Sequence, residues 1–255
     1  GHRPSDWLPS HLPANVRLIV SVTEIESTGM RVFDPDGQFQ SPSGILVGPL
    51  VEDEMRTIVA AALQSNDRCL QTGQLDALLS RAARCPRPLC LELLVKEACR
   101  WRSWTPPPPT WAREAGPSAE VDEIVGDFLR GLEEPSRHGP VFVGGALGYL
   151  AASRGGLSED ELLDVLSADE EVMADFRRRS PDSPNEDRLP VIVWSRLALD
   201  LQFAVAARRA GNVSFLGFAN RSLKRSVEQR YLTSGREVAV HAHLARYFRY
   251  THPGA

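Results

Sequence analysis

Apolar residues recur at helical spacing along much of the chain. One helical face is formed by Met55, Ile58, Val59, Ala62 and Leu63. This spacing of three and four residues predicts a helix over 52–64. Similar patterns predict helices over 72–84 and 88–101, and Pro88 suits the start of the latter because its φ is already helical and its missing N–H has no partner there. We expect these three helices to form a compact helical subdomain.

A run of four prolines at 106–109 marks a boundary, because it favours extended chain rather than helix. Beyond it the pattern predicts helices over 119–132, 141–154, 158–166, 190–208, 219–232 and 237–249. Ser118 and Ser158 are the expected N-caps of the first and third of these helices, and a polar loop is expected over 177–188. A strand is predicted over 213–218 (VSFLGF), after the turn signal Ala210-Gly211-Asn212. Helices followed by a short β-ribbon and a further helix are typical of a winged-helix unit.

The first apolar run differs from these helical patterns. Residues 16–22, VRLIVSV, are rich in β-branched side chains and predict a buried strand of a parallel sheet. Ser21 and Thr23 lie at its end, where open α/β sheets place groups that touch ligands. Parallel neighbours need crossover connections, for which few residues precede this strand. We therefore expect the chain to be the C-terminal portion of a larger nucleotide-switch module.

These patterns define a fold class and three expected domains. The fold should be mainly α, with a remnant of a P-loop α/β sheet over 1–50, the helical subdomain over 51–117 and a winged-helix-like domain over 118–255. The Pro-rich linker ends the second of these domains. No run of eighteen apolar residues is present, so no membrane span is expected, and a cytoplasmic location fits best.

Charge is unevenly distributed along the chain. The net charge is −4, yet residues 201–255 contain eight arginines and one lysine against two glutamates. Such a basic end favours either nucleic acid or an acidic partner within the same chain. Residues 157–187 hold eleven acidic side chains, so we prefer the internal partner. The four cysteines show no CxxC spacing, which favours buried free thiols over a zinc site.

The residues for ATP hydrolysis are not found in this sequence. A phosphate-binding loop needs GxxxxGK followed by Ser or Thr, and neither Lys96 nor Lys224 follows a glycine. No apolar strand ends in acidic residues suited to Mg²⁺. We therefore expect no catalytic residues here and no ATP hydrolysis by the chain alone. His241 and His243 are two residues apart on a predicted helix, which places them on different faces and argues against a shared metal.

Several phrases together resemble one family. In order they are WLPSHLPANVRLIVSV (7–22), VGPLVEDE (47–54), RPLCLELLVKEA (87–98), SRGGLSEDELLDVLS (153–167), LPVIVWSRL (189–197), RSLKRSVEQRYL (221–232) and HAHLARYF (241–248). They resemble the C-terminal part of NACHT-type STAND NTPases, in the branch fused to WD repeats that includes telomerase-associated-protein-like chains.

The resemblance implies roles for individual residues. The strand at 16–22 would be the sensor strand, with Ser21 beside the γ-phosphate. Thr23 occupies a place where many relatives have arginine. Pro88 resembles the proline that packs on adenine. Related chains often carry a histidine where this one has Asn220, so a histidine contact to the ADP phosphates is not expected.

The resemblance also implies a function. The chain would be the regulatory part of a STAND signalling ATPase, clamping ATP or ADP with Mg²⁺ together with an upstream P-loop domain. The winged helix would fold back over bound ADP and gate homo-oligomerisation, and WD repeats would follow. Two alternatives remain open: a winged-helix module that binds nucleic acid, which the internal acidic partner makes less favoured, and a nucleotide-independent protein-interaction scaffold.

Overall fold

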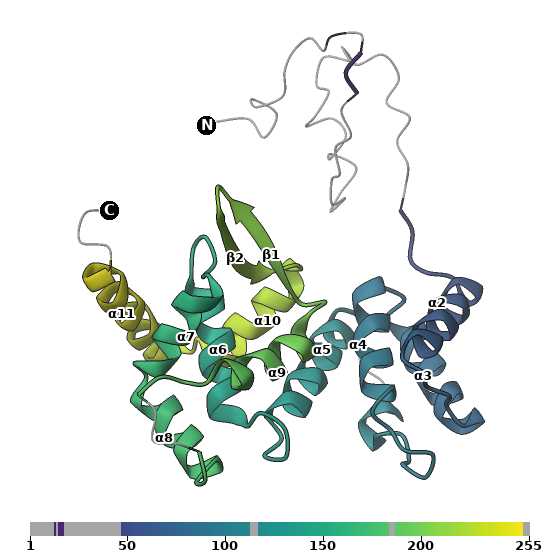
Figure 1. The fold of residues 1–255 in the computed structure, drawn as a ribbon. Helices are drawn as coiled ribbons and strands as arrows, with labels where there is room; N and C mark the ends of the chain where they lie inside the picture. Colours follow the sequence, from purple (N-terminus) through teal and green to yellow (C-terminus); the bar gives the residue numbers. More distant parts are fainter. Residues whose placement is uncertain (1–12, 14, 18–46, 113–116, 184–186, 252–255) are drawn as a thin grey trace. The chain divides into compact units, whose positions relative to one another are not determined.

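The computed structural model describes residues 13, 15–17, 47–112, 117–183 and 187–251 (Figure 1). The chain divides into two compact units, residues 1–48 and 49–255. Most of the strand predicted over 16–22 lies outside the described residues. The two residues of it that are described, Val16 and Arg17, are not in a strand.

Three helices open the second unit, as the apolar spacing predicts. They are α2 (Glu52–Ser65), α3 (Thr72–Arg84) and α4 (Pro88–Ala98). Their apolar faces are turned inward, with Val59, Leu78 and Leu94 all buried. Helix α4 ends at Ala98, three residues before its predicted end at Trp101. Trp101 instead packs on Trp111 of the 3₁₀ turn η1 (Pro109–Ala112), with ring centroids 4.8 Å apart.

The rest of the unit contains helices and one β-ribbon. The helices are α5 (Pro117–Glu133), α6 (Pro140–Ala152), α7 (Glu159–Ser167), α8 (Glu170–Arg179), α9 (Val191–Leu201), α10 (Arg221–Tyr231) and α11 (Ser234–Thr251). The ribbon joins β1 (Val205–Ala210) to β2 (Val213–Phe218) between α9 and α10. Most of the described residues are helical, so the prediction of a mainly α fold is confirmed. Helices followed by a two-stranded ribbon and further helices are the order of elements in a winged helix.

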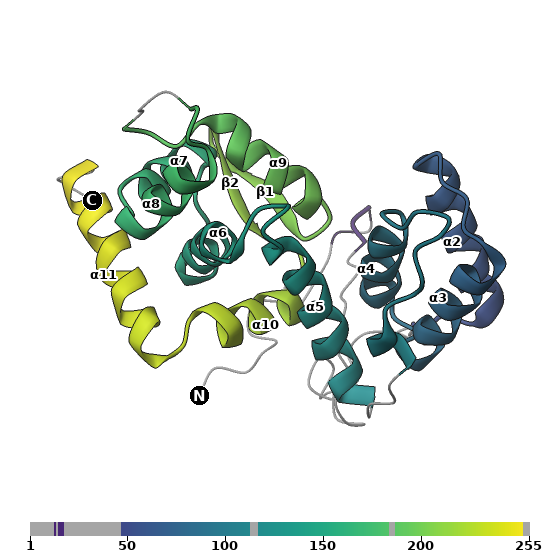
Figure 2. The ribbon, with the colours of Figure 1, turned by 90° about the horizontal axis from the view of Figure 1, so that it is seen from below.

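Helix α6 is the centre of this helical group. Every residue from Phe142 to Ala151 is buried, and Figure 2 shows α7, α8 and α10 around the helix. A helix that is apolar on all sides can be stable only when neighbours cover it completely. Gly145 allows one close approach, because a Cβ there would lie 2.9 Å from a methyl group of Val172 in α8. One hydrophobic core, running from Met55 to Leu244, spans the whole unit.

The ribbon is anchored to the helices through a third short segment. Leu157 and Leu216 exchange backbone hydrogen bonds of 3.3 and 2.7 Å, which adds an isolated bridge to the antiparallel pair. Gly156 precedes this bridge with φ +92°, and a Cβ at that position would collide with the carbonyl oxygen of Leu216. Only glycine combines that backbone angle with so close an approach.

Three predicted details are wrong. The helix expected over 190–208 ends at Leu201, and its last residues form β1, because β2 needs an antiparallel partner and the turn at Gly211-Asn212 supplies one. The loop expected over 177–188 begins only after Arg179, since α8 extends to that residue. Helix α5 begins at Pro117, so Ser118 lies within the helix and is not its N-cap. Ser158 is the N-cap of α7 as predicted: its hydroxyl accepts a hydrogen bond from the N–H of Glu161.

Candidate functional site

Pro88 lies on a short exposed bend that we call the α3–α4 elbow (residues 85–90). It is the first residue of α4, and its side chain is exposed. The elbow is held by backbone hydrogen bonds, from the N–H of Leu50 to the carbonyl of Pro86 at 2.9 Å and from Arg87 to Cys85 at 2.7 Å. Pro88 is thus a rigid apolar group that a planar ligand can reach.

Of the three predicted nucleotide contacts, Pro88 is the one that the structure describes. Ser21 and Thr23 lie outside the described residues. Asn220 is the N-cap of α10, where its side-chain oxygen accepts hydrogen bonds from the N–H groups of Ser222 and Leu223 at 2.8 and 3.4 Å. Its oxygen therefore serves the helix end, which is the usual role of asparagine before a helix.

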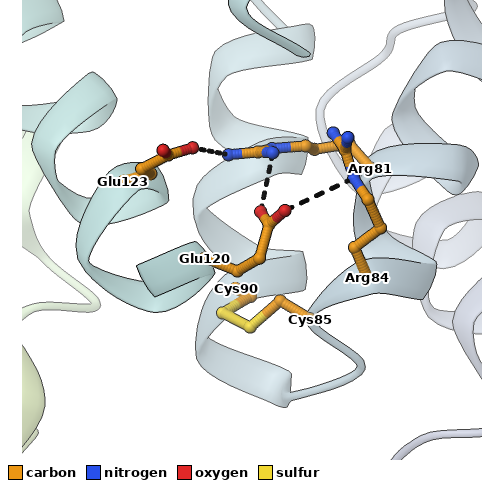
Figure 3. The surroundings of a disulfide bond; sticks show 6 residues. All are labelled: Arg81, Arg84, Cys85, Cys90, Glu120 and Glu123. Carbon is orange, nitrogen blue, oxygen red and sulfur yellow. Dashed lines mark hydrogen bonds and ion pairs between the residues drawn. A yellow bond between two sulfur atoms is a disulfide. The ribbon is translucent and has the colours of Figure 1, made fainter. Parts of the chain in front are cut away.

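A buried cluster of charges joins α3 to α5. Arg81 and Glu120 are both fully buried and lie 2.6 Å apart. Arg81 also pairs with Glu123 at 3.1 Å, and Arg84 approaches Glu120 at 3.6 Å (Figure 3). We call these four residues the Arg81–Glu120 cluster. Buried charges are tolerated only when they are paired, so the cluster ties the last turn of α3 to the first turn of α5.

A second polar contact joins α5 to α10. Arg230 and Tyr231 of α10 both donate hydrogen bonds to the carboxylate of Glu133, with distances of 2.9 Å from Nε and 2.5 Å from the hydroxyl. Burial alone would raise the pKa of Glu133, but these two donors outweigh it and the pKa is lowered. The pKa of Tyr231 is raised by its burial and by the adjacent carboxylate.

A third cluster lies where the α5–α6 loop meets α9. His138 Nε2 lies 2.9 Å from Asp200 Oδ2, and Arg137 contacts the same oxygen at 2.7 Å. Burial lowers the pKa of His138 despite its carboxylate partner. Burial would raise the pKa of Asp200, but hydrogen bonds from His138 and Arg137 hold it below its usual value.

The cysteines differ from the expectation of buried free thiols. Cys85 and Cys90 are linked by a disulfide that closes the α3–α4 elbow. Cys69 and Cys99 are free, the first exposed and the second half-buried. The spacing of five residues did not indicate the bond; the sharp bend made by Pro86 and Pro88 brings the two side chains together.

The basic C-terminal segment does not dock on the acidic segment through ion pairs among the described residues. Helix α11 contacts α7, but through His243, which lies 3.2 Å from the carbonyl of Val165, and through Tyr247, whose hydroxyl donates to Asp164 at 3.2 Å. The pKa of Tyr247 is raised to about 12 by burial and by this carboxylate. Within the described part of the chain, Asp160 and Asp164 take Arg188 as their ionic partner.

The face of α9 that meets solvent is largely apolar, although Arg196 is also exposed there. Val191, Ile192 and Leu199 are exposed large hydrophobic residues of this helix. Next to them a hollow of about 360 Å³ lies between α9 and the ribbon, with Val205 and Leu216 among the residues that line it. In helix-turn-helix proteins the recognition helix presents polar and basic side chains to DNA; on α9 the exposed Arg196 could serve such a contact, beside exposed apolar residues that could not.

Neither a metal site nor a membrane-spanning helix is found among the described residues. In residues 47–112, 117–183 and 187–251, no group of three or more His, Cys, Asp or Glu side chains is placed to hold a metal ion. Across the same ranges no helix combines the length and the apolar character that a bilayer crossing needs.

The three polar clusters were not predicted from the sequence, for a common reason. Their partners are far apart in sequence, such as Arg81 with Glu120 and His138 with Asp200. One signal was present in the pattern: Arg81 is three residues after Leu78, on the buried face of α3. A charge on a buried helical face requires a partner, although the sequence does not say which.

Comparisons with known proteins agree with the architecture. Residues 120–239 match the family described as NWD1-like, winged helix-turn-helix domain. The human NACHT domain- and WD repeat-containing protein 1 is 33% identical over 248 residues, which cover 95% of this chain and 15% of the human protein. The human NACHT and WD repeat domain-containing protein 2 is 27% identical over 248 residues, covering 95% of the chain and 13% of that protein.

The mouse NACHT domain- and WD repeat-containing protein 1 is similar to the same extent, with 32% identity over 97% of the chain and 15% of the mouse protein. The chain thus spans only about 15% of the length of these relatives. No solved structure matches it significantly. The likeness nevertheless extends through the helical part as well as the winged helix, which confirms the resemblance drawn from the sequence phrases. Residues 120–239 thus form a winged helix-turn-helix domain of the NWD1-like family, and over nearly its whole length the chain is similar to NACHT and WD repeat-containing proteins.

Proposed function

We propose that this chain is the regulatory half of a nucleotide switch, which clamps ATP or ADP with Mg²⁺ against a P-loop domain elsewhere in the parent protein. The observation that carries the proposal is the similarity to NACHT proteins over 95% of the chain. In this arrangement the P-loop domain supplies the phosphate and Mg²⁺ ligands. The helical and winged-helix parts close over the nucleotide, and their rearrangement on exchange permits homo-oligomerisation.

The described residues fit an adenine contact at Pro88. The ring of Pro88 is exposed and held at the start of α4 by the hydrogen-bonded elbow. A rigid apolar surface of this kind suits the flat face of a purine, because ordering it costs little conformational entropy. Ser21 and Thr23 are the proposed contacts to the phosphates, on the resemblance alone.

The role of Pro88 is tested in the parent protein with a fluorescent ADP analogue. Pro88→Ala removes two ring carbons from the proposed contact, so the affinity should fall about three- to tenfold, on the scale of about 0.8 kcal/mol per buried methylene. Pro140→Ala is a matched control, because Pro140 is also an exposed proline at the start of a helix. Equal affinities for the two variants would contradict the adenine contact.

A nucleic-acid-binding function is the second candidate. The observation in its favour is a set of exposed arginines on the ribbon and α10 that form no ion pair with any described residue: Arg208, Arg209, Arg221 and Arg225. The exposed apolar residues Val191, Ile192 and Leu199 of α9 weigh against it, because they cannot contact phosphates, whereas Arg196 of the same helix can. Duplex DNA binding that weakens steeply with added salt would favour this candidate over the nucleotide clamp. Partner binding that persists in a parent protein unable to hold nucleotide would favour a scaffold.

A further inference from the structure

The disulfide closes a ring around the most exposed part of the α3–α4 elbow. Cys85 and Cys90 are 2% and 0% exposed, whereas Arg87 and Pro88 between them are exposed. The bond therefore lies beneath a surface bend and holds both ends of it.

The two sulfur atoms have opposite electrostatic surroundings. Cys90 is the third residue of α4, in the first turn, where the helix dipole stabilises a thiolate. Cys85 directly follows the last turn of α3, where the dipole has the opposite sign. When a thiolate attacks a disulfide, the sulfur that better carries negative charge leaves faster. Attack at Cys85 with departure of Cys90 is thus the favoured route of reduction.

We propose that Cys85 and Cys90 are a reversible thiol–disulfide modification site that sets the stiffness of the α3–α4 elbow. A dithiol reductant attacks the Cys85 sulfur and expels Cys90 as a thiolate, which takes up a proton. The second thiol of the reductant then releases Cys85 from the mixed disulfide. The pair gains two electrons and two protons, and the reductant becomes a cyclic disulfide.

The elbow is connected to three other parts of the unit, so its stiffness has consequences beyond the ring. The carbonyl of Pro86 accepts the N–H of Leu50, just before α2. The N–H of Cys85 donates to Ala82 and ends α3. Arg84, the residue before Cys85, belongs to the Arg81–Glu120 cluster that reaches α5 (Figure 3). Opening the ring should loosen these amides first.

The first test is whether the bond forms and can be reduced in the folded chain. The protein is exposed to oxidised glutathione and then to dithiothreitol without denaturant, and free thiols are alkylated after each step and located by mass spectrometry. Cys69 is exposed and serves as the fast-reacting control. Cys99 should react more slowly, because burial raises the pKa of its thiol. We expect Cys85 and Cys90 to be protected after oxidation and alkylated after native reduction.

The second test measures the elbow itself by hydrogen exchange. Reduction should increase the exchange rate of amides in residues 85–91 at least tenfold, and Cys85→Ser should show the fast rate in both conditions. Cys69→Ser should behave like the unaltered chain. Alkylation of all four cysteines after oxidation, or reduction only in denaturant, would overturn the reversible site. Unchanged exchange on reduction would overturn the control of elbow stiffness.

Discussion

Arg81 and Glu120 show how single residues join the two helical parts. Both side chains are completely buried, and the arginine has a second carboxylate partner in Glu123. Replacing a buried ion pair by apolar residues is often neutral, but removing one partner leaves an uncompensated charge in the interior. The pair therefore adds little net stability, but it requires that α3 and α5 stay in contact, because either charge alone would be costly in the interior.

Glu120→Gln tests this constraint directly. The substitution keeps the shape of the side chain and removes the carboxylate that Arg81 and Arg84 share. Because Arg81 keeps Glu123, the free energy of unfolding should fall by about 3 kcal/mol, the lower end of the range for a buried charge that loses its partner. Denaturant unfolding measures the change. Glu52→Gln is the control, because the Arg56–Glu52 pair has side chains 51% and 70% exposed and should contribute less than about 1 kcal/mol. Similar losses in both variants would show that the buried pair is no tighter than a surface one.

Elements whose signal is local were predictable from the sequence. The apolar spacing and turn residues predict α3 and β2 with the bounds that the structure shows. Helix α8 was missed although its sequence carries a local signal, an Asp169 cap with acidic residues first and arginines last. Strand β1 could not be found in this way, because VAARRA has no apolar alternation and becomes a strand only by pairing with β2.

The candidate site was less predictable than the fold. Pro88 was correctly placed at the start of a helix because proline suits the first helical turn, whereas its contact with adenine came from the family resemblance and stays a prediction. The disulfide, the Arg81–Glu120 cluster and the His138–Asp200 pair depend on contacts between separate elements, and no local pattern encodes such distances. Ser21 and Thr23 remain predictions.

Gly156 is the residue on which the attachment of the ribbon depends. Gly156→Ala should lower the free energy of unfolding by about 1–3 kcal/mol, because alanine is strained at φ +92° and its Cβ would collide with the carbonyl of Leu216. Gly155→Ala is the neighbouring control, since a Cβ there meets nothing within 4 Å. Thermal unfolding measures the stability of both variants. A loss of stability in Gly155→Ala without one in Gly156→Ala would contradict the proposed close approach.

At the scale of the whole molecule, the second unit has one continuous core from α2 to α11. Its three polar clusters lie where separate elements meet: α3 with α5, α5 with α10, and the α5–α6 loop with α9. The hydrophobic core stabilises the unit, and the polar clusters determine which helices pack against one another.

These clusters make stability depend on pH. Burial lowers the pKa of His138 from 6.5, and the pKa of Asp200 is lowered from 3.8 by its donors. The folded state then binds fewer protons than the unfolded state, so stability is full above the unfolded pKa values and is lost as the pH falls below them. We expect the free energy of unfolding to decline from about pH 6.5 downward, with a further decline below about pH 4.

His138→Gln should remove the loss of stability that begins at about pH 6.5 and keep the further loss below about pH 4. Denaturant unfolding between pH 7.5 and 5, conditions chosen around the ordinary histidine pKa of about 6.5, measures it. His241→Gln, at an exposed position of α11, is the control. A decline of unchanged size in His138→Gln would assign the pH dependence to other groups.

The Arg81–Glu120 cluster also sets a lower limit on the affinity difference that a ligand needs between two states, one with α3 joined to α5 and one with the two helices apart. If nucleotide exchange moves α3 away from α5 and leaves one of these charges buried without its partner, the cost is about 3–5 kcal/mol. The incoming nucleotide must then prefer the separated arrangement by roughly 150- to 5,000-fold in affinity to populate it. A nucleotide with a smaller preference would leave the two helices joined, however tightly it bound.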